Sequence, residues 1–266
     1  MKYERRHYPD GGVYAVIYNF DHPIIKERIN TYEDLFFIKS LKDICDYNDV
    51  EVELFIPCMF QQQHDRRFNE NESFELRIVA DFINSCNFKR VYIHHPHSDV
   101  TGALINRSRV IDNHLFINEV LRKVGSENLV LMSSDAGGFK PLIKLADIIE
   151  WKGETESAAK SRDPLTHKLT QQVSTMDFKG KDVLIVDDIC VYGGTFVGLG
   201  KIMETRNVGK MYLACSHVTV KEPSRELPNY YDRMFTTNSK YDSYDVMTIV
   251  GTERKPFIEI IKTLDL

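Results

Sequence analysis

Short apolar runs and helix-like apolar stripes alternate along this chain. After Thr31, the apolar residues Leu35, Ile38, Leu41 and Cys45 recur every three or four positions, which predicts a helix that begins at a Thr31 cap. Similar stripes predict further helices near residues 76–86, 116–124, 140–149 and 195–204. Runs of apolar or β-branched residues predict strands at residues 13–20, 50–56, 90–94, 129–133, 183–186, 211–220 and 244–250.

The alternation of strands and helices predicts an α/β protein with mostly parallel sheets flanked by helices. Acidic turns with a Gly-Gly pair follow predicted strands near residue 135 and near residue 188, which indicates two such units. We predict an N-terminal domain over residues 1–127 and a C-terminal domain over residues 128–266, with a return of the last strand to the first domain as an alternative. The polar residues 150–181 lack an apolar period, so we expect a functional loop or a linker there.

Composition and charge restrict the functions that the chain can have. Its 42% hydrophobic and 27% charged residues are ordinary for a water-soluble globular protein. The net charge of −5 and the lack of a Lys/Arg block argue against a general nucleic-acid binder. Five scattered cysteines without Cys-x-x-Cys spacing indicate reduced thiols, and no apolar run reaches the length of a membrane span. We therefore expect a cytoplasmic protein that binds neither nucleic acid nor membrane.

The strongest chemical signal follows the predicted strand at residues 183–186. Asp187 and Asp188 stand at its end, and the Gly-Gly-Thr sequence of residues 193–195 precedes the next predicted helix. In an open α/β sheet, ligands bind at the carboxyl ends of the strands. Glycines let backbone N–H groups converge on a phosphate, and a helix N-terminus adds partial positive charge there. Since paired carboxylates suit sugar hydroxyls, the pattern predicts a ribose-phosphate site.

This stretch resembles the phosphoribosyl-pyrophosphate (PRPP) loop of type I phosphoribosyltransferases and of ribose-phosphate pyrophosphokinases. Three earlier segments, at residues 56–68, 95–98 and 130–138, are similar to the ATP-binding segment, the metal-binding histidine segment and the Asp-Ala-Gly-Gly turn of the pyrophosphokinases. Phosphoribosyltransferases carry only the PRPP loop, so the resemblance favours the ribose-phosphate pyrophosphokinase (PRPP synthetase) family. It implies two type I phosphoribosyltransferase-like domains.

The resemblance also implies a reaction and a set of site residues. Members of the family use Mg²⁺ to transfer the β,γ-diphosphate of ATP to the anomeric 1-hydroxyl of ribose 5-phosphate, release AMP, and assemble as dimers or hexamers. The ATP-binding positions of the family match Gln63, His64, Asp65, Arg66 and His97. Its acceptor-binding positions match Asp187, Asp188, Tyr192, Gly193, Gly194 and Thr195, and its metal-binding positions match His97 and Asp135. Its catalytic cations match Lys160 and Arg162, with Lys152 as the competing assignment.

Three departures from the family pattern bear on function. Gln63 and His64 stand where the family usually has Arg-Gln, which removes a guanidinium near the nucleotide, and the segment after His97 is one residue short. Val191 and Tyr192 replace an acidic and a small hydroxyl residue. Since an aromatic ring can stack on an attached base, we expect the acceptor to be either ribose 5-phosphate or a 5′-substituted ribose such as ADP-ribose. The alternative is that Tyr192 points away from the site.

Other interpretations stay open at this point. A phosphoribosyltransferase that consumes PRPP and a catalytically inactive, regulatory relative are both compatible with parts of the pattern. Asp65 and Arg66 can form a structural ion pair instead of contacting ATP. We expect structural roles for His94 and His95, and a buried thiol at Cys190 because the implied reaction needs none.

Overall fold

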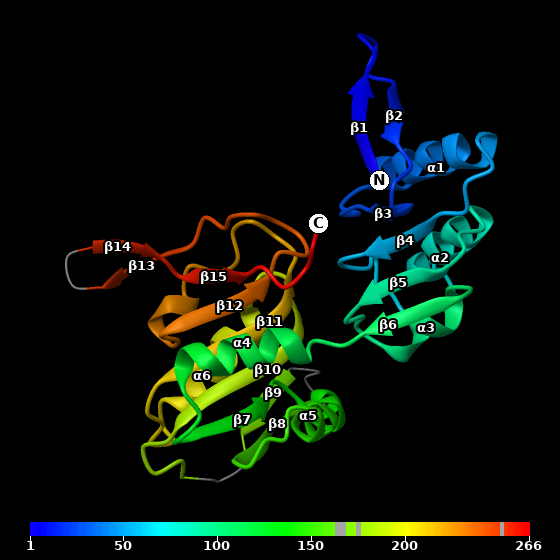
Figure 1. The fold of residues 1–266 in the computed structure, drawn as a ribbon. Helices are drawn as coiled ribbons and strands as arrows, with labels where there is room; N and C mark the ends of the chain where they lie inside the picture. The colour runs from blue at the N-terminus through cyan, green and yellow to red at the C-terminus, as the bar shows by residue number, and fades with distance from the viewer. Residues whose placement is uncertain (163–168, 174–176, 251–252) are drawn as a thin grey trace. The chain divides into compact units, whose positions relative to one another are not determined.

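The computed structural model describes residues 1–162, 169–173, 177–250 and 253–266, without the side chains of residues 159–162, 169–173, 249–250 and 253–254 (Figure 1). The chain divides into two compact units, Met1–Asp112 with Leu266, and Asn113–Asp265. This division lies before helix α4 (His114–Val124) and thus earlier than the boundary predicted after residue 127. The physical reason is that the apolar side of α4 packs into a core cluster of the second unit.

The first unit contains a four-stranded parallel sheet with the order β3-β4-β5-β6 and a separate antiparallel hairpin, β1-β2. Its strands are β1 (Lys2–His7), β2 (Val13–Asn19), β3 (Ile24–Lys26), β4 (Glu53–Ile56), β5 (Val91–His94) and β6 (Ser108–Ile111). Its helices are α1 (Tyr32–Tyr47), α2 (Glu75–Ser85) and α3 (Asp99–Leu104). The core of this unit lies between the sheet and the apolar stripes of α1 and α2, as the helical spacing predicts.

Helix α1 begins where the sequence predicts. Its N-cap, Thr31, accepts a hydrogen bond from the Asp34 N–H at 3.4 Å, and Asp34 accepts one from the Thr31 N–H at 2.8 Å. This reciprocal capping box satisfies two backbone donors that the first turn leaves without helical partners. Arg5 of β1 donates to Asp34 at 2.7 Å and lies over the Phe37 ring, so the same carboxylate ties the hairpin to α1.

The second unit is built on a seven-stranded sheet with the order β15-β12-β11-β10-β7-β8-β9. Neighbouring strands are parallel except for β8 and β9. The strands are β7 (Leu129–Ser133), β8 (Glu154–Arg162), β9 (Leu169–Val173), β10 (Asp182–Cys190), β11 (Met211–Val218), β12 (Arg233–Thr237) and β15 (Ile258–Ile261). The remaining elements are α4, α5 (Ala136–Ile148), α6 (Gly194–Met203), the 3₁₀ turn η1 (Leu227–Asn229) and a hairpin of β13 (Met247–Val250) and β14 (Glu253–Pro256).

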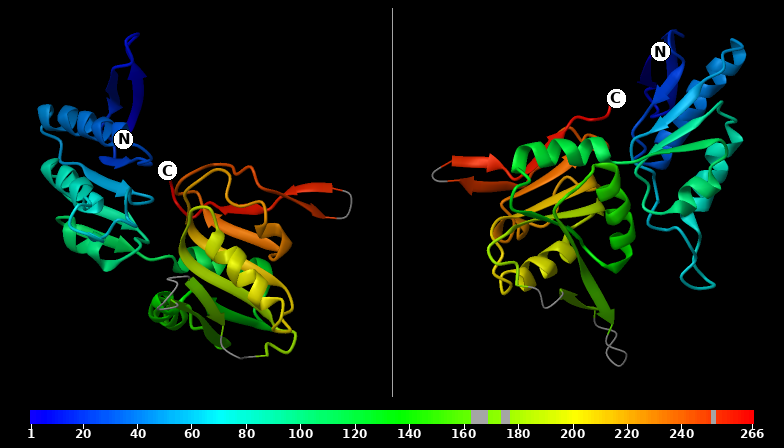
Figure 2. Two further views of the ribbon diagram at one scale, coloured as in Figure 1. Left: turned by 180° about the vertical axis from the view of Figure 1, so that it is seen from behind. Right: turned by 60° about the horizontal axis from the view of Figure 1, so that its bottom comes forward.

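Strand β10 lies inside this sheet with apolar residues on both faces. Val183 and Ile185 belong to the core cluster that includes α6, whereas Leu184 and Val186 belong to the cluster that includes α4 and α5. Figure 1 accordingly shows α4 in front of the sheet, and the reversed view of Figure 2 shows α6 in front. A strand buried on both faces needs a continuous apolar run, which is the pattern that predicts this strand.

One expectation for the second unit is wrong, and one alternative is not realised. The stretch predicted as a loop or linker contains the strands β8 and β9, because β8 pairs first with β7 and then with β9. Backbone pairing between strands does not require an apolar period, so the polar sequence showed no sign of β8 and β9. The last predicted strand, residues 244–250, corresponds to β13, which pairs with β14 inside the second unit and does not return to the first. The later strand β15 was not predicted, and it pairs with β12. Of the helices that the structure describes, none is both long and apolar enough for a membrane span.

Candidate active site

The two acidic residues after the central apolar run lie within β10, not beyond its end. Pairing of β10 with β7 stops at Val186 and Ser133, whereas its pairing with β11 continues as far as Cys190. Asp187 and Asp188 therefore follow the last rung shared with β7 while β11 still holds their backbone. The sequence did not show this extension because the polar residues interrupt the apolar run. The consequence is a pair of carboxylates on rigid backbone at the carboxyl end of the sheet.

Asp187 is fixed by its neighbours on both sides. Its Oδ2 accepts a hydrogen bond from the Ser134 hydroxyl, and its Oδ1 accepts one from the Asp188 N–H at 2.8 Å. Burial, followed by the negative charge of Asp188, raises the pKa of Asp187 well above its ordinary value. A ligand that donates hydroxyl hydrogens or brings positive charge would relieve this repulsion. The site is thus suited to sugar hydroxyls or a cation rather than to a bare anion.

The acceptor loop, which we define as residues 191–195, joins β10 to α6. Gly193 has a φ of +83°, a left-handed conformation that glycine adopts without strain. A Cβ at this position would also come within 3.0 Å of a Leu227 methyl group. Tyr192 is 69% exposed, and Gly194 begins α6. The loop therefore presents a helix N-terminus to the same end of the sheet as Asp187, and such a terminus favours a phosphate.

Asp135 lies at the tip of β7 and is the N-cap of α5. Its Oδ1 accepts a hydrogen bond from the Gly138 N–H at 3.0 Å. Its backbone carbonyl accepts hydrogen bonds from the hydroxyls of Ser133, at 2.8 Å, and Ser157, at 3.2 Å. The carboxylate remains half-exposed. Since Ser134 bonds to Asp187, the tips of β7 and β10 that carry the predicted acidic residues are directly connected.

The segment that resembles an ATP-binding segment follows β4 in the first unit. Gln62 is buried and accepts a hydrogen bond from the His97 N–H at 3.0 Å, which joins this segment to the loop after β5. Arg66 Nε donates to the buried Asp65 at 3.0 Å, so the ion pair considered as a structural alternative is present. Burial opposes ionisation of Asp65, yet the Ser98 hydroxyl and the Arg66 guanidinium hold its pKa below the ordinary value.

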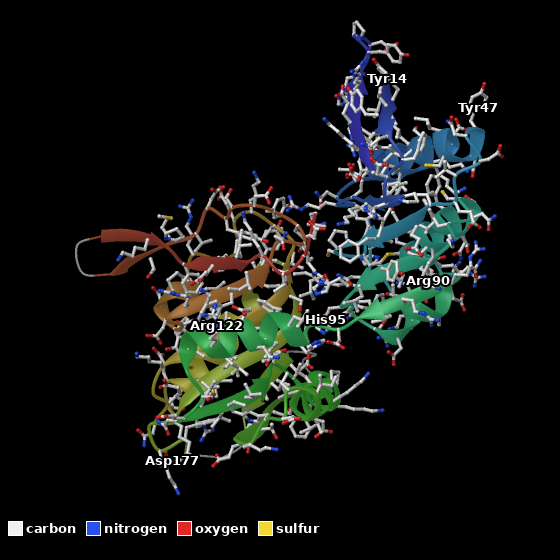
Figure 3. All side chains as sticks on the ribbon, viewed as in Figure 1. Tyr14, Tyr47, Arg90, His95, Arg122 and Asp177 are labelled. Carbon is white, nitrogen blue, oxygen red and sulfur yellow. The ribbon has the colours of Figure 1, made fainter. Side chains whose placement is uncertain are left out.

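Four of the predicted ATP-binding residues lie at the surface. Gln63, His64, Arg66 and His97 are all exposed. The turn that brings His97 towards Gln62 passes through His95, labelled in Figure 3, which has a φ of 38°. His94 is buried and lies 3.3 Å from the carbonyl oxygen of Pro57, as expected of a structural histidine.

The remaining predicted site residues are Lys160, Arg162 and His97. Lys160 and Arg162 lie on β8 opposite Gln171 and Leu169 of β9, and their side chains lie outside the described part of the structure. His97 and Asp135 belong to different units. Among the side chains that the structure does describe, no group of three or more His, Cys, Asp or Glu residues forms a metal site.

A family model named Phosphoribosyl transferase domain matches residues 104–249 of this chain. This chain belongs to that family. The match covers more than half of the chain and nearly the whole of the second unit, with β7, β10, the acceptor loop and α6. The phosphoribosyl transferase domain thus contains both connected strand tips.

Curated relatives of this phosphoribosyl transferase domain protein are named ribose-phosphate pyrophosphokinase. The protein of Archaeoglobus fulgidus is 25% identical over 81% of this chain and 75% of its own length, and that of Sulfurisphaera tokodaii is 22% identical over 90% and 82%. The protein of Mycoplasma genitalium is 26% identical over 61% of this chain, and the match spans 48% of that relative, about half its length. The solved phosphoribosylpyrophosphate synthetase of Mycobacterium smegmatis has the same fold, with a TM-score of 0.77, 16% identity, and coverage of 98% of this chain and 86% of that one.

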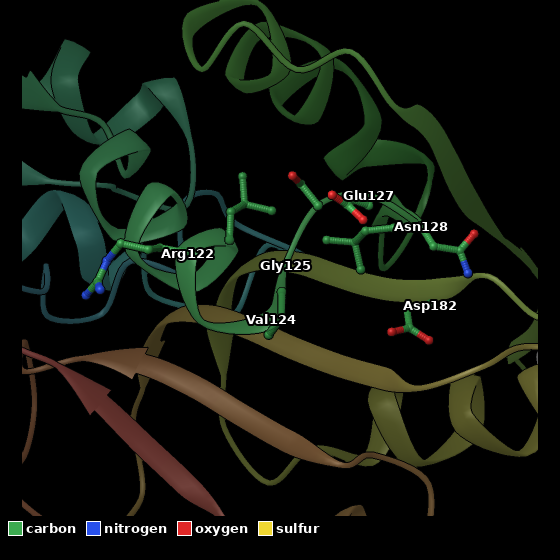
Figure 4. Close-up of a pocket in the computed structure, with 9 residues that line it drawn as sticks. Arg122, Val124, Gly125, Glu127, Asn128 and Asp182 are labelled. Atoms are coloured by element: carbon green, nitrogen blue, oxygen red, sulfur yellow. The ribbon is translucent and has the colours of Figure 1, made fainter.

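A surface depression of about 540 Å³ lies at the opposite end of the phosphoribosyl transferase domain (Figure 4). It is lined by the end of α4, the connection of residues 125–128 and the first residues of β7 and β10, and the lining includes Arg122, Glu127, Asn128 and Asp182. Ligands of parallel sheets bind at the carboxyl ends of the strands, whereas this depression lies at the amino ends. Its mixed charges favour no particular ligand, so the candidate site remains at the carboxyl ends.

Sequence reasoning missed several residues that shape the site. Ser134 was overlooked although it directly precedes Asp135, and its position at a strand tip was a usable signal. Ser224, whose N–H donates to the Tyr192 carbonyl at 2.8 Å, and Leu227, which packs against Gly193, follow β11. Neither has a sequence signal, because their contacts with the acceptor loop arise from the tertiary fold alone.

Proposed function

We propose that this protein transfers the β,γ-diphosphate of ATP to the anomeric 1-hydroxyl of a ribose 5-phosphate unit and releases AMP. The observation that carries the proposal is the connection of the β7 and β10 tips through Ser134 and Asp187 beside the acceptor loop. Carboxylates for ribose hydroxyls and a helix N-terminus for the 5′-phosphate thereby lie at one edge of one sheet. The names of the relatives supply the reaction class.

We further propose that the exposed residues after β4 and β5 contact ATP. Gln63, His64, Arg66 and His97 provide amide, imidazole and guanidinium donors for the base and the phosphates. Asp65 instead supports them, because its carboxylate is buried against Arg66. Lys160 and Arg162 of β8 are our candidates for the cations that neutralise the transferred diphosphate.

Mg²⁺ is the metal that fits the oxygen donors of this site. Asp135, Asp187 and Asp188 do not form a cluster of three ligands in the described part of the structure. Mg²⁺ takes few protein ligands and keeps several waters, so one or two of these carboxylates suffice. When bound, Mg²⁺ would neutralise the phosphate oxygens of ATP. His97 is the other proposed metal contact, although imidazole is an unusual partner for Mg²⁺. Asp135 can contribute only in part, because its Oδ1 also caps α5.

A product assay tests the proposed function. The protein is incubated with ATP and Mg²⁺ and either ribose 5-phosphate or ADP-ribose, and AMP is measured. We expect AMP with at least one acceptor, and none after chelation of the metal or in Asp188→Asn. Asp182→Asn is the matched control, because Asp182 stands at the amino end of the same strand and bonds the Lys210 N–H at 2.7 Å. No AMP with either acceptor would refute the proposal.

The choice of acceptor is a second proposal, and the exposure of Tyr192 favours ADP-ribose as a candidate beside ribose 5-phosphate. A ring that is 69% exposed at the start of the acceptor loop is available for stacking on a base attached beyond the phosphate. Tyr192→Thr should therefore raise the KM for ADP-ribose and leave that for ribose 5-phosphate unchanged. Equal effects on the two acceptors would show that Tyr192 is not the selector.

Two alternative functions are tested with the same purified protein. Release of pyrophosphate from PRPP and a base would identify a PRPP-consuming phosphoribosyltransferase. Binding of ATP without turnover of any substrate would identify an inactive, regulatory relative. We propose a homo-oligomeric assembly as for the family, and light scattering of the purified protein measures its mass.

A further inference from the structure

The acceptor loop is held in place by the segment that follows β11. The Ser224 N–H donates to the Tyr192 carbonyl at 2.8 Å, and the Thr219 N–H donates to the Cys190 carbonyl, just before the loop, at 2.9 Å. Leu227 packs against Gly193 so closely that a Cβ there would meet its methyl group at 3.0 Å. The position of the loop therefore depends on where residues 219–227 lie.

The carboxyl end of β11 is in turn held by hydroxyl groups from a segment about twenty residues further along the chain, residues 236–245. The Thr237 hydroxyl donates to the Ser216 carbonyl at 2.7 Å. The Tyr244 hydroxyl donates to the Val218 carbonyl at 2.9 Å, and the Tyr241 hydroxyl donates to the Thr219 carbonyl at 3.2 Å. The backbone carbonyl groups of Ser216, Val218 and Thr219, at the end of β11 and just beyond it, thus each accept a hydrogen bond from a side chain of residues 236–245.

Two of these three contacts are made away from water, whereas the contact between Tyr241 and Thr219 is half-buried. Thr237 and Ser216 are fully buried, and Tyr244 is 7% exposed. The fully buried His217 shares a 2.8 Å hydrogen bond between its Nδ1 and the Ser239 hydroxyl.

The Ser216 carbonyl also accepts longer hydrogen bonds from the hydroxyls of Thr236, at 3.4 Å, and Ser239, at 3.3 Å, so loss of the Thr237 hydroxyl weakens its anchoring without leaving it unpaired. The Val218 carbonyl would lose the Tyr244 hydroxyl, and a buried carbonyl that loses its donor favours a shift of the β11 backbone. Such a shift would reach the acceptor loop through Thr219.

We infer that Thr237, Tyr241 and Tyr244 are positioning residues that set the affinity of the acceptor loop for the 5′-phosphate of the acceptor. None of the three is assigned a contact with substrate; they act through Thr219 and the segment after it. The inference rests on the proposed function, because it concerns the same loop. It adds that hydroxyl groups of residues 237–244 affect binding of the acceptor but do not affect the proposed ATP-binding residues of the first unit.

Isosteric variants test this inference. Tyr244→Phe and Thr237→Val each remove one hydroxyl and little volume, whereas Thr237→Ser keeps the hydroxyl. Tyr3→Phe is the matched control, since it removes a tyrosine hydroxyl that donates to a backbone carbonyl, that of Lys26, at 3.0 Å in the first unit. For each variant, KM for acceptor, KM for ATP and kcat are measured, together with hydrogen exchange of the amides of residues 191–195 without substrate.

The expected result is a rise of roughly five-fold in the acceptor KM of Tyr244→Phe, which corresponds to one neutral hydrogen bond. A smaller rise is expected in Thr237→Val, because two other hydroxyls also donate to the Ser216 carbonyl. KM for ATP should change little, Thr237→Ser should restore the wild-type value, and Tyr3→Phe should resemble wild type. An unchanged acceptor KM, or equal changes in both KM values, would overturn the inference. If the wild-type protein releases no AMP, the proposed function fails separately. Faster exchange at residues 191–195 in Tyr244→Phe then supports the coupling, and unchanged exchange refutes it.

Discussion

The hydroxyl group of Ser134, at the tip of β7, donates a hydrogen bond to Oδ2 of Asp187 in β10. This bond favours the charged form of Asp187 and so opposes burial and the charge of Asp188, which raise its pKa. In Ser134→Ala the pKa of Asp187 should rise further, so that acceptor binding is lost first at the acidic end of the active pH range. The measurement is KM for the acceptor against pH. Ser40→Ala removes a hydroxyl that donates to the Phe36 carbonyl within α1 and should leave this profile unchanged.

Replacement of Asp187 should stabilise the protein while it weakens function. A carboxyl group whose pKa is raised by folding binds more protons in the folded state, so the free energy of unfolding falls as pH rises from the unfolded pKa to the folded one. Asp187→Asn removes this loss and should stabilise the substrate-free protein by on the order of 1 kcal/mol above neutral pH. Thermal unfolding at several pH values measures the effect.

The control for that prediction is Asp177→Asn. Asp177 is an exposed carboxylate whose pKa is lowered by the Lys179 N–H and by Asn207, so its replacement should not stabilise the protein at any pH. Destabilisation by Asp187→Asn at alkaline pH would contradict our account of the paired carboxylates.

The two glycines of the acceptor loop should respond differently to alanine. Gly193→Ala places a Cβ in a left-handed conformation and against Leu227, which should cost about 1–2 kcal/mol and raise the acceptor KM. At Gly194 a Cβ meets open space and φ is not positive, so Gly194→Ala should leave stability nearly unchanged. Unfolding curves and the acceptor KM compare the two, and equal losses of stability would show that the fold does not constrain Gly193.

Asp34 should stabilise the first unit in a pH-dependent manner. Burial opposes its ionisation, but the N–H groups of Asn30 and Thr31 and the guanidinium of Arg5 hold its pKa below the ordinary value. The stabilisation is present above the unfolded pKa and is lost as pH falls through the folded one. Asp34→Ala should therefore cost about 1–2 kcal/mol at neutral pH and less in acid. Glu33→Gln, at 3.7 Å from Arg5 and more exposed, is the control and should cost much less.

The sequence predicted those parts of the fold in which the local side-chain pattern determines the secondary structure. The Thr31 cap with the stripe after it and the doubly buried run from Val183 to Val186 each follow from local chemistry, and both are confirmed. Strand β8 has no such sequence pattern, because it is held by backbone pairing with β7 and β9, which does not require particular side chains. The extent of β10 was missed for a similar reason, since β11 continues to pair with it beside Asp187 and Asp188.

The candidate site shows the same limit. Motifs located the acidic residues and the Gly-Gly-Thr sequence because such residues form local turns and helix starts. Ser134 and Leu227 act on them from other elements, and those contacts appear only when the strands are assembled. The domain boundary differs from the predicted one for a similar reason. Helix α4 packs into a core cluster of the second unit, and its own sequence does not show this.

Strand β8 starts beside β7 in the seven-stranded sheet and continues without a break into the ribbon that carries Lys160 and Arg162. The backbone at these cations is thus an extension of the same strand that flanks Ser133 and, two residues beyond it, Asp135. Pairing with β7 and β9 fixes this backbone when the protein folds, so under the proposed function less conformational entropy remains to be lost when a polyphosphate binds. A peptide of residues 154–162 alone would carry the same two charges but not this strand pairing, so its backbone would have to be ordered on binding.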